Sequence, residues 1–472
     1  MKIVVCVKQA VSGELNPFDA CAYEAALQMD GAQVVLLSMG PEKTKDFLLE
    51  LTRLGAKEAY LLCDKAFAGA DTLATAYTLS LAIKKLQPDL VICGRQTVDG
   101  DTGQTGPSLA QVAGLDLITN VMEIKSTENS VTCVTRNAGE CTAAYPALIT
   151  IEKINQLRLP SIRSKRGSVT VWNAGDLQAD LNRCGAKGSP TKVLKTFHNE
   201  EGRRKCQFVE PAMLDSLIAQ GMQKEKNKII PKTDGKRLKN LWIIGEKCRE
   251  MAESISDDIT VIPKGNAEEW LTCFVERIKE QAPNAILWDS EPWSKRVAPQ
   301  VAALLQTGLC ADCTALETDG EHLYMYRPAF AGNVVAKIAC TTNPQMATVR
   351  TLAEGTADVI LSLGKGAKAA QSAVEDYVQA QNQKSQTRFE TAASRGAVDM
   401  DMLPYAKQVG LTGKRVSPAV YVAIGISGAV HHIAGMQQSG TVIAINPDQD
   451  APIFDYADFG IIATAEEIFT EK

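Results

Sequence analysis

Two adjacent histidines, His431 and His432, follow a run of small residues in the stretch GISGAVHHIAGM (425–436). The stretch lies between the apolar runs AVYVAIG (419–425) and TVIAIN (441–446), which have the composition of buried strands. Small residues after a strand allow backbone amides to approach a ligand, and an imidazole can face a carbonyl that gains electrons. The pattern therefore indicates a ligand loop in which a histidine takes part in chemistry.

Other small-residue turns occur in the same region, at GKG (364–366), ASRG (393–396), KQVGLTG (407–413) and AIN (444–446). Each turn follows, or lies between, predicted strands or helix starts. The turns can therefore converge at the carboxyl ends of one parallel sheet, where open α/β folds bind ligands. Arg395 and the amides around Gly428 suit a pyrophosphate, while Gln408 and Thr412 can bond ring nitrogens or oxygens.

A further candidate loop, GRQTVDGDTGQTGP (94–107), follows the apolar run PDLVICG (88–94) near the N-terminus. A loop between a parallel strand and a helix presents free N–H groups and the positive end of the helix, which suits a nucleotide phosphate. A long solvated turn is the alternative, because glycine and aspartate also favour turns.

The elements that must position these loops are short β-branched runs alternating with amphipathic stretches. The alternation begins with KIVVCV (2–7), DACAYEAALQM (19–29) and AQVVLLSM (32–39), continues to DLVICG (89–94), and resumes at NLWIIG (240–245). It predicts βαβ units with parallel sheets. Between about 160 and 235 the pattern loosens, and a helical stretch, PAMLDSLIAQGMQ (211–223), precedes a polar run, which predicts an arm and a linker.

The two sides of this linker resemble each other. A buried strand, a loop and a helix occur in the order PDLVICG (88–94) to GPSLAQVAGLDLITNV (106–121), and again in PNAILWD (283–289) to APQVAALLQTGLCADCTAL (298–316). The chain is therefore predicted to contain a duplicated α/β unit. The loop of the second copy, WDSEPWSKRV (288–297), is bulky, so only the first can bring backbone amides close to an anion.

Composition narrows the class of protein. With 472 residues, 45% of them hydrophobic, the chain can form about three domains. A net charge of −5 gives no general attraction to nucleic acid or to anionic membranes, and no apolar run approaches membrane-spanning length. The start of the chain lacks a secretory pattern and the thirteen cysteines have no framework spacing, so we expect a cytoplasmic protein. We assign no chemistry or metal to the Cys310 and Cys313 pair.

Ser394 to Asn446 resembles the flavin-binding domain of the alpha subunit of electron-transfer flavoproteins. Residues 1–232 resemble the beta subunit, through VKQ, NPFD, GRQTVDGDTGQTGP, INQLRLPS and CGAKGSPTK, and residues 239–472 resemble the alpha subunit. The resemblance implies both subunits fused in one chain, as an α/β protein with two pseudo-symmetric parallel-sheet domains forming a base and a C-terminal doubly wound FAD-binding domain. It divides the chain into a beta-subunit-like nucleotide-binding domain (1–190), an arm and linker (191–238), a domain like the N-terminal part of the alpha subunit (239–350) and the FAD-binding domain (351–472). The resemblance also implies that the FAD-binding domain swings about a hinge at 351–355.

The resemblance also implies roles for individual residues. Ser394 and Arg395 match the pair beside the pyrophosphate and the isoalloxazine ring, Thr412 matches the hydroxyl that bonds flavin N5, and His432 matches the imidazole near O2. Arg395, Thr412 and His432 are therefore the expected catalytic residues. The other implied FAD contacts are Lys365, Gly366, Gln408, Val409, Gly410, Gly413, Ser427, Gly428, Ala429, His431 and Asn446. This sequence departs from the family at four positions. Arginine is usual at Lys365, glutamine is usual at Leu411 and at His431, and an acidic residue is usual at Thr464.

The N-terminal half of such proteins holds AMP or a second FAD. The pattern DTLAT (71–75) with GRQTVDGDT (94–102) matches the members with a second FAD, which implies reduction by NADH and electron bifurcation. An AMP in this half stays the alternative. The expected contacts of this nucleotide are Cys6, Asn16, Asp71, Thr72, Asp99, Gly100, Asp101, Thr102, Gln104 and Thr105.

The expected function is electron transfer through FAD between NADH or a flavin dehydrogenase, such as an acyl-CoA dehydrogenase-like protein, and another redox acceptor. The alternative class is a non-redox adenine-nucleotide-binding regulatory or scaffold protein with the same fold. The stretch NQLRLPSIRSKRG (155–167) falls at the family's recognition loop, where Leu159 either enters a partner's pocket or packs internally.

Overall fold

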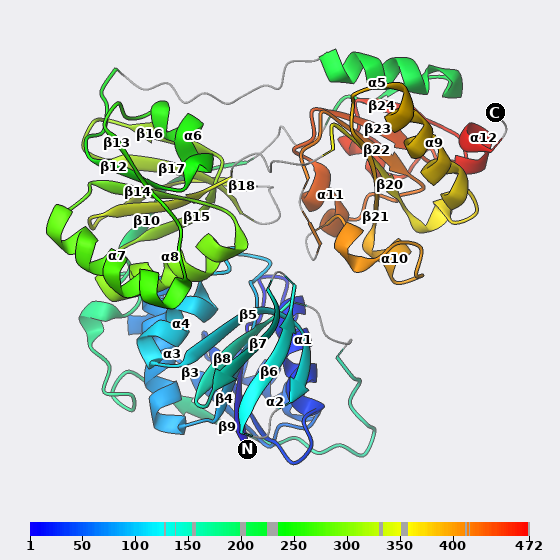
Figure 1. The fold of residues 1–472 in the computed structure, drawn as a ribbon. Coiled ribbons are helices and arrows are strands. Elements are labelled where there is room, and N and C mark those ends of the chain that lie inside the picture. Colours follow the sequence, from blue (N-terminus) through cyan, green and yellow to red (C-terminus); the bar gives the residue numbers. More distant parts are fainter. Residues whose placement is uncertain are drawn as a thin grey trace. The chain divides into compact units, whose positions relative to one another are not determined.

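The computed structural model describes residues 1–126, 129–136, 138–152, 157–198, 204–223, 235–329, 334–350, 357–410, 413–414 and 416–470. The chain divides into two compact units (Figure 1). The first unit comprises Met1–Thr196, Ile230–Phe330 and Ala336–Thr351, and the second comprises Phe197–Ile229, Ala331–Val335 and Leu352–Lys472. Each unit is a layered α/β structure, as the sequence predicts.

The N-terminal half of the first unit is built on a nine-stranded sheet with the order β7-β6-β5-β8-β4-β1-β2-β3-β9. Its strands are β1 (Lys2–Cys6), β2 (Gln33–Met39), β3 (Glu58–Leu62), β4 (Leu90–Gly94), β5 (Asp116–Ser126), β6 (Ser130–Thr135), β7 (Gly139–Ala144), β8 (Ala147–Ile151) and β9 (Ser168–Trp172). All pairs are parallel except β5 with β6 and β6 with β7. The predicted parallel sheet is confirmed.

Helices cover both faces of this sheet, because successive strand residues point to opposite sides. Ile3 and Val5 join the core under α1 (Pro17–Leu27) and α2 (Thr44–Thr52), whereas Val4 joins the core under α3 (Thr72–Leu86) and α4 (Thr105–Ala113). The strands are therefore buried on both sides, which explains their continuous apolar runs.

The second half of the first unit repeats this architecture. Its five-stranded sheet has the order β13-β12-β14-β19-β15, with β12 (Leu241–Ile244), β13 (Ile259–Ile262), β14 (Ala285–Asp289), β15 (Leu309–Cys313) and β19 (Gln345–Val349). Read from β15, this order is the order of β5, β8, β4, β1 and β2 in the first half, so the predicted duplication is confirmed. The helices are α6 (Arg249–Glu253), α7 (Ala267–Gln281) and α8 (Pro292–Leu305).

Equivalent helices join the two halves. α4 and α8 each follow the central strand of their sheet, and the Ser108 hydroxyl of α4 donates to the Pro299 carbonyl of α8 at 3.3 Å. A four-stranded sheet, in the order β10-β18-β17-β16, adds a second connection. Its strands are β10 (Thr191–His198), β16 (Ala315–Thr318), β17 (Leu323–Ala329) and β18 (Val334–Cys340). The chain that leaves the first half thus completes a sheet of the second.

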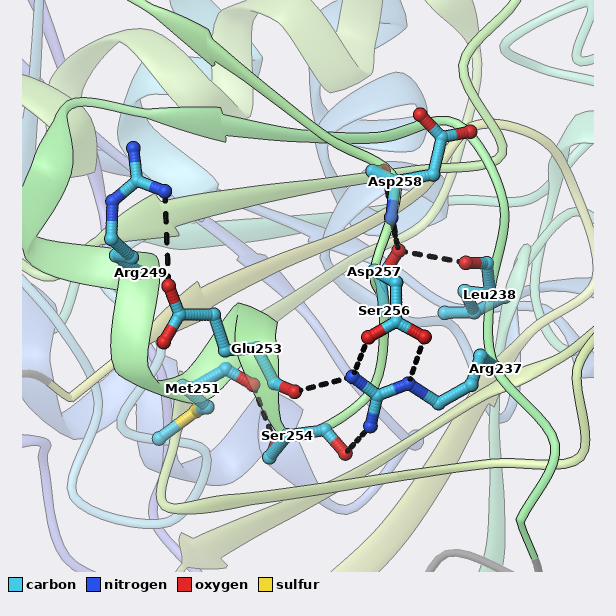
Figure 2. Close-up of polar contacts among 9 residues, drawn as sticks. All are labelled: Arg237, Leu238, Arg249, Met251, Glu253, Ser254, Ser256, Asp257 and Asp258. Carbon is cyan, nitrogen blue, oxygen red and sulfur yellow. Dashed lines mark hydrogen bonds and ion pairs between the residues drawn. The ribbon is translucent and has the colours of Figure 1, made fainter.

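An arginine clamp fixes the point where the second half begins (Figure 2). The Arg237 guanidinium donates to both carboxylate oxygens of Asp257, at 3.0 and 2.6 Å, and to the carbonyls of Glu253 and Ser254 at the end of α6. A cation at a helix C-terminus pairs with carbonyls that have no partner inside the helix. Arg237 therefore anchors the entering chain to α6.

The second unit contains a parallel sheet with the order β11-β24-β23-β22-β20-β21. Its strands are β11 (Gln207–Phe208), β20 (Val359–Leu363), β21 (Phe389–Ala393), β22 (Val420–Ile424), β23 (Thr441–Ile445) and β24 (Phe459–Ile461), and its helices are α5 (Leu214–Gln223), α9 (Gln371–Lys384), α10 (Arg395–Val398), α11 (Val430–Met436) and α12 (Ala465–Phe469). Buried residues of α9 and α12 pack on one face and those of α11 on the other, which makes the sheet doubly wound.

Part of the predicted arm folds into this second unit. β11 pairs in parallel with β24, and α5 buries Leu214, Leu217 and Ile218 in the same core as β20, β22 and β23. Gly221 completes the i, i+3, i+4, i+7 spacing, and a Cβ there would lie 2.6 Å from Val420. The predicted helix at 211–223 is confirmed as a short 3₁₀ turn, Pro211–Met213, followed by α5.

Across the described ranges, no helix is both long enough and apolar enough to cross a membrane. The longest helices, α3 and α7, each have 15 residues and carry charged side chains. Burial of their apolar residues against the sheets accounts for their hydrophobic faces.

Candidate functional site

The carboxyl edge of the sheet in the second unit has the topology of a ligand site. From β20 the chain passes to β21 on one side and then returns to β22 on the other, so the winding direction reverses between β20 and β22. In open α/β sheets such a reversal leaves a crevice outside the carboxyl ends of the two strands. The expected binding position is therefore the first turns after Leu363 and Ile424.

The predicted flavin residues within the described ranges follow the carboxyl ends of the strands of this sheet or flank them. β20 leads to Lys365 and Gly366, β21 leads to Ser394 and Arg395, β22 leads to the loop 425–429, and β23 leads to Asn446. Gln408 is paired with Ala393 in an isolated parallel bridge, and Val409 is bridged to Lys414. Thr412 and Leu411 lie outside the described residues, so the proposed N5 contact has no structural account here.

Glycines are required where the turns meet. A Cβ on Gly364 would lie 2.0 Å from the Gly425 carbonyl oxygen, and Gly425 itself has a φ of +61°. Gly428 has a φ of +94°, and a Cβ there would lie 2.2 Å from the Ile453 nitrogen. Side chains are sterically excluded from these positions, and a positive φ favours glycine. The turns after β20 and β22 therefore present backbone rather than side chains at the crevice.

The packing of α11 brings a buried histidine to this edge. Gly435 packs against Gly410, since a Cβ on Gly435 would lie 2.4 Å from the Gly410 nitrogen, and the Val416 amide donates to the Gly435 carbonyl at 2.8 Å. This close approach places the backbone of Val409 beside the ring of His432. His431, one position earlier on the helix, is exposed.

The two nitrogens of His432 have different environments. Nε2 lies 3.0 Å from the Tyr421 hydroxyl in the core, whereas Nδ1 is buried and makes no hydrogen bond of good geometry among the residues described, although the Val409 backbone lies next to the ring. Burial lowers the pKa of His432 to about 4, and the Val409 backbone partly opposes this shift. The ring is therefore neutral at physiological pH, and a Tyr421 hydroxyl that donates to Nε2 leaves the ring proton on Nδ1.

The cationic residues of the edge are more exposed. Arg395 opens α10 with a side chain that is 52% exposed, and its Nε lies 3.6 Å from Asp399. The methylene groups of Lys365 lie over Gly396, where a Cβ would approach the Lys365 Cε to 2.3 Å. The hydroxyl of Ser394, the N-cap of α10, accepts from the Ala397 amide at 3.3 Å. Two cations and a helix start thus lie next to each other at the ends of β20 and β21.

Other predicted contacts have a positioning role within the chain. The Asn446 side chain donates to the Ile426 carbonyl at 3.0 Å and accepts from the Asp448 amide at 2.9 Å, so it supports the loop that carries Ser427 and Gly428. Gln408 is 1% exposed, and Gly413 packs on its backbone, where a Cβ would lie 2.3 Å from the Gln408 carbonyl oxygen. Ala429 is the N-cap of α11 and has an exposed side chain.

The first unit has a second edge of the same kind. After β1 the chain forms β2 and β3 on one side of β1 and then places β4 on the other, so the winding reverses between β1 and β4. Cys6 and Cys93 are register partners at the carboxyl ends of these two strands. The glycine-rich loop predicted from the sequence follows β4 and leads to α4, which begins at Thr105.

Polar side chains shape this first-unit loop. Asn16 is fully buried, and its amide donates to the Gln96 carbonyl at 2.9 Å while its oxygen accepts from the Val98 amide at 3.2 Å. Gln96 in turn donates to Asp101 at 2.7 Å. Asp99 accepts from the Val11 amide and pairs with Lys8 at 3.2 Å. Gly100, Thr102 and Thr105 belong to the same loop or to the start of α4.

Gln104 has an orphaned donor at this edge. The side chain is 3% exposed, its oxygen accepts from the Thr72 hydroxyl at 3.0 Å, and its Nε2 has no partner in the described structure. Asp71 caps α3 through the amides of Leu73 and Ala74 and accepts from Thr191 at 2.6 Å. The DTLAT stretch therefore ties the start of α3 to β10 and orients Gln104.

Three features of this edge were not predicted. Asp19 is 5% exposed and accepts from the Lys8 amide at 2.8 Å, and burial raises the pKa of its carboxyl to about 7 despite bonds from Asn16, Lys8 and Gly94. Arg95 and Arg136 both bond one oxygen of buried Glu152. Arg327 of the second half donates to the Gly100 carbonyl at 2.7 Å. The NPFD motif contains Asp19, but its burial could not be predicted. The contacts of Asp19 and of these arginines join residues that are distant in sequence, and a local sequence pattern does not reveal them.

The equivalent edge of the second half is filled by side chains. Lys264 pairs with buried Asp289 and with Glu291, the latter at 2.7 Å, and the Ser294 hydroxyl donates to Asp289 at 2.6 Å. The Trp293 indole donates to the Gly265 carbonyl at 3.0 Å. Of the two copies, only the first presents a glycine-rich loop here, which agrees with the interpretation of the sequence.

A doubly wound sheet whose carboxyl edge carries glycine turns, adjacent cations and a buried imidazole is typical of a nucleotide-binding α/β domain. The comparisons with known families name the cofactor. The model of the electron transfer flavoprotein FAD-binding domain matches residues 355–437, and the model of the electron transfer flavoprotein domain matches residues 3–177 and 260–380, more than half of the chain. The chain belongs to the electron transfer flavoprotein family, and the cofactor of its C-terminal region is FAD.

Relatives match separate parts of the chain. The electron transfer flavoprotein subunit beta of Megasphaera elsdenii is 40% identical over 235 residues, which cover 42% of this chain and 87% of that protein. Protein FixA of Azorhizobium caulinodans is 36% identical over 262 residues, which cover 47% of this chain and 93% of that protein. Protein FixB of Clostridium saccharobutylicum is 32% identical over 274 residues, which cover 48% of this chain and 81% of that protein. Subunits that are separate in relatives are thus joined here, and electron transfer is favoured over a non-redox scaffold.

Proposed function

We propose that the chain carries electrons through a FAD held at the carboxyl edge of the second unit, between NADH or a flavin dehydrogenase and another redox protein. The observation that carries the proposal is the occurrence, at one sheet edge, of the glycine turns at Gly364, Gly425 and Gly428 and of the buried Nδ1 of His432, which makes no hydrogen bond of good geometry among the described residues. A buried donor without a partner is costly unless a ligand satisfies it. FAD supplies one-electron and two-electron chemistry when bound, and the residues present fit it.

Different side chains bind the pyrophosphate and the flavin ring. Lys365 and Arg395 supply positive charge beside the helix start at Ser394, which suits a pyrophosphate. The Lys365 ammonium group is a single point of charge and cannot make the two parallel hydrogen bonds that an arginine guanidinium makes to an anion. His432 donates a hydrogen bond from Nδ1 toward the flavin ring, where a fixed dipole in a low-dielectric site favours the added negative charge of reduction. Thr412 remains the proposed partner of N5.

A second FAD at the edge between β1 and β4 is the finer proposal, with NADH as the electron donor and bifurcation between two acceptors as the outcome. The orphaned Nε2 of Gln104 and the loop shaped by Asn16 support a nucleotide there. The caffeyl-CoA reductase-Etf complex subunit CarD of Acetobacterium woodii is 38% identical over 205 residues. AMP in this place is the alternative.

Release of the nucleotides from native protein tests both sites. Heat or acid extraction followed by chromatography should yield about two FAD per chain and no AMP. One FAD with one AMP would overturn the second-FAD proposal and leave the C-terminal FAD in place. A protein that yields adenine nucleotides without flavin would favour the scaffold alternative.

We propose that the stretch after β8 docks redox partners such as an acyl-CoA dehydrogenase. Leu159 is 90% exposed and Ile162 is 100% exposed, which favours a docking role over internal packing of Leu159. Arg158 anchors the stretch through Glu24, with contacts of 2.7 to 3.1 Å to its carboxylate. Exposed apolar residues next to Arg163 and Arg166 suit a small transient interface.

The four-part division at residues 190, 238 and 350 and a cytoplasmic location complete the proposal. The separate sheets of the two halves and of the second unit support the division. The thirteen free cysteines suit a reducing compartment. The proposed hinge at 351–355 lies outside the described residues.

A further inference from the structure

Arg204, in the segment that precedes β11, is the centre of a polar cluster in the second unit. Its guanidinium donates to the carbonyls of Gln437, Ser439 and Gly440 at 3.2, 2.6 and 3.0 Å, and to the carboxylate of Asp458. The side chain is 15% exposed, and the Arg204 amide donates to the Asp455 carbonyl at 2.8 Å. One side chain thus binds three backbone carbonyls and one carboxylate.

These carbonyls lie where α11 ends and β23 begins. α11 has 7 residues, and its N-cap, Ala429, has no side chain that could cap it. Gln437 is the C-cap of α11, where a cation stabilises the terminal carbonyls and the helix dipole, whereas Ser439 and Gly440 belong to the turn that leads to β23. Asp458 extends the cluster, because the same oxygen accepts from the Val442 amide at 2.8 Å. Arg204 therefore fixes the C-terminal end of α11 against β23.

The position of α11 determines the position of His432. The Gln437 amide donates to the Ile433 carbonyl, so the turn held by Arg204 continues directly from the turn that carries the histidine. On its other side α11 is held by the contact between Gly435 and Gly410. A shift of the helix end would move the Nδ1 of His432 relative to the crevice.

We propose that Arg204 is a positioning residue of the flavin site, acting through α11 on His432. The proposal rests on the proposed function, since it needs His432 to face the flavin. It assigns a role in cofactor binding to a segment that lies in sequence next to the first unit. The arm then contributes to the geometry of the site as well as to the core.

The test compares Arg204→Gln with Arg204→Lys in the full-length protein. Flavin affinity is measured by equilibrium dialysis, and the one-electron reduction potentials are measured by anaerobic spectral titration. Arg204→Gln should weaken flavin binding by about tenfold or more, because the end of α11 loses its hydrogen bonds to a charged group. It should also shift the potentials, and Arg204→Lys, which keeps the charge but loses the fork, should recover part of the affinity.

Arg237→Gln is the matched control, because Arg237 makes the same kind of contact at the end of α6 in the first unit. It should leave the flavin in the second unit at wild-type affinity and potentials. Arg204→Gln with wild-type affinity and potentials would overturn the proposal, even if its melting temperature falls. If Arg204→Gln does not fold, Arg204→Lys is used instead, and wild-type flavin affinity and potentials in that variant would overturn the role of Arg204. Absence of flavin from the wild-type protein would overturn the proposed function.

Discussion

The His432 imidazole is buried, and its two ring nitrogens have different surroundings. Tyr421 bonds Nε2, and burial raises the pKa of the Tyr421 hydroxyl, which therefore stays protonated. A neutral imidazole with its proton on Nδ1 is a fixed dipole that needs no proton uptake during reduction. Electrostatic stabilisation by His432 then comes from a directed N–H group.

The buried His432 makes the stability of the second unit depend on pH. Its pKa is lowered from 6.5 to about 4 on folding, so the unfolded chain binds a proton that the folded chain excludes between these values. Stability should be unaffected by this group above pH 6.5 and should fall as the pH drops toward 4, by about 3 kcal/mol at most. Denaturant titrations at pH 7.5 and pH 4.5 measure the difference.

His432→Gln should reduce that pH dependence, because the variant lacks the buried titrating group. His431→Gln is the matched control, since His431 is exposed on the same helix, and it should keep the wild-type acid profile. Equal pH dependence in wild type and His432→Gln would contradict the assigned environment of the ring.

Residue types and spacing predicted which turns gather at the carboxyl edges, because small residues directly after strands carry a local signal. They did not predict that Tyr421 occupies one nitrogen of His432, or that Asp19 is buried beneath the first loop. Such contacts join residues that are distant in sequence. Periodicity contains no information about them.

At the scale of elements, α5 joins a core from which it is separated by more than a hundred residues. The stretch PAMLDSLIAQGMQ (211–223) was predicted to be helical, and the alternation of apolar runs and amphipathic stretches predicted the strands. The partner of this helix could not be inferred, because many apolar surfaces in the chain could have covered it. The two-residue strand β11 is too short for any periodicity.

Leu214→Ala should destabilise the second unit by about 2–5 kcal/mol, the usual cost of a cavity at a fully buried leucine. Leu214 is 1% exposed and packs in the core of the sheet that carries the flavin edge. Differential scanning calorimetry of the full chain, with flavin fluorescence as a second probe, should show earlier unfolding of the flavin-containing unit.

Met213→Ala, one residue before, is the control, since Met213 is 44% exposed. Its effect should stay within about 0.5 kcal/mol, as for most surface substitutions. If Leu214→Ala unfolds like wild type, α5 is not part of the core of the second unit in solution.

At the scale of the whole molecule, one chain contains a duplicated α/β unit and an FAD-binding unit, and its relatives include separately named subunits. Residues 191–196 complete a sheet of the first unit, and residues 204–223 contribute to the second. Joining the subunits makes their association intramolecular, with an effective concentration set by the connecting chain. Assembly of the flavin site should therefore be independent of protein concentration.

The stretch 157–163, which carries the exposed residues Leu159 and Ile162, is where the whole molecule should meet a partner. Leu159→Ala should slow flavin reduction by a purified acyl-CoA dehydrogenase by about fivefold or more, because an anchor residue of a small interface contributes over about 1 kcal/mol. Flavin content and thermal stability should not change. Val11→Ala, at another exposed apolar residue of the same half, should react at the wild-type rate. An unchanged rate in Leu159→Ala would place docking elsewhere.

The chain belongs to the electron transfer flavoprotein family, and we propose that it carries FAD at the edge of its second unit and a second FAD in its first. Anaerobic absorbance spectroscopy during titration of the native protein with NADH tests this proposal most directly. Visible flavin absorbance should be equivalent to about two FAD per chain, should bleach as NADH is added, and should return when an oxidised redox partner is supplied. A colourless protein, or a bound flavin that neither NADH nor a flavin dehydrogenase reduces, would contradict it.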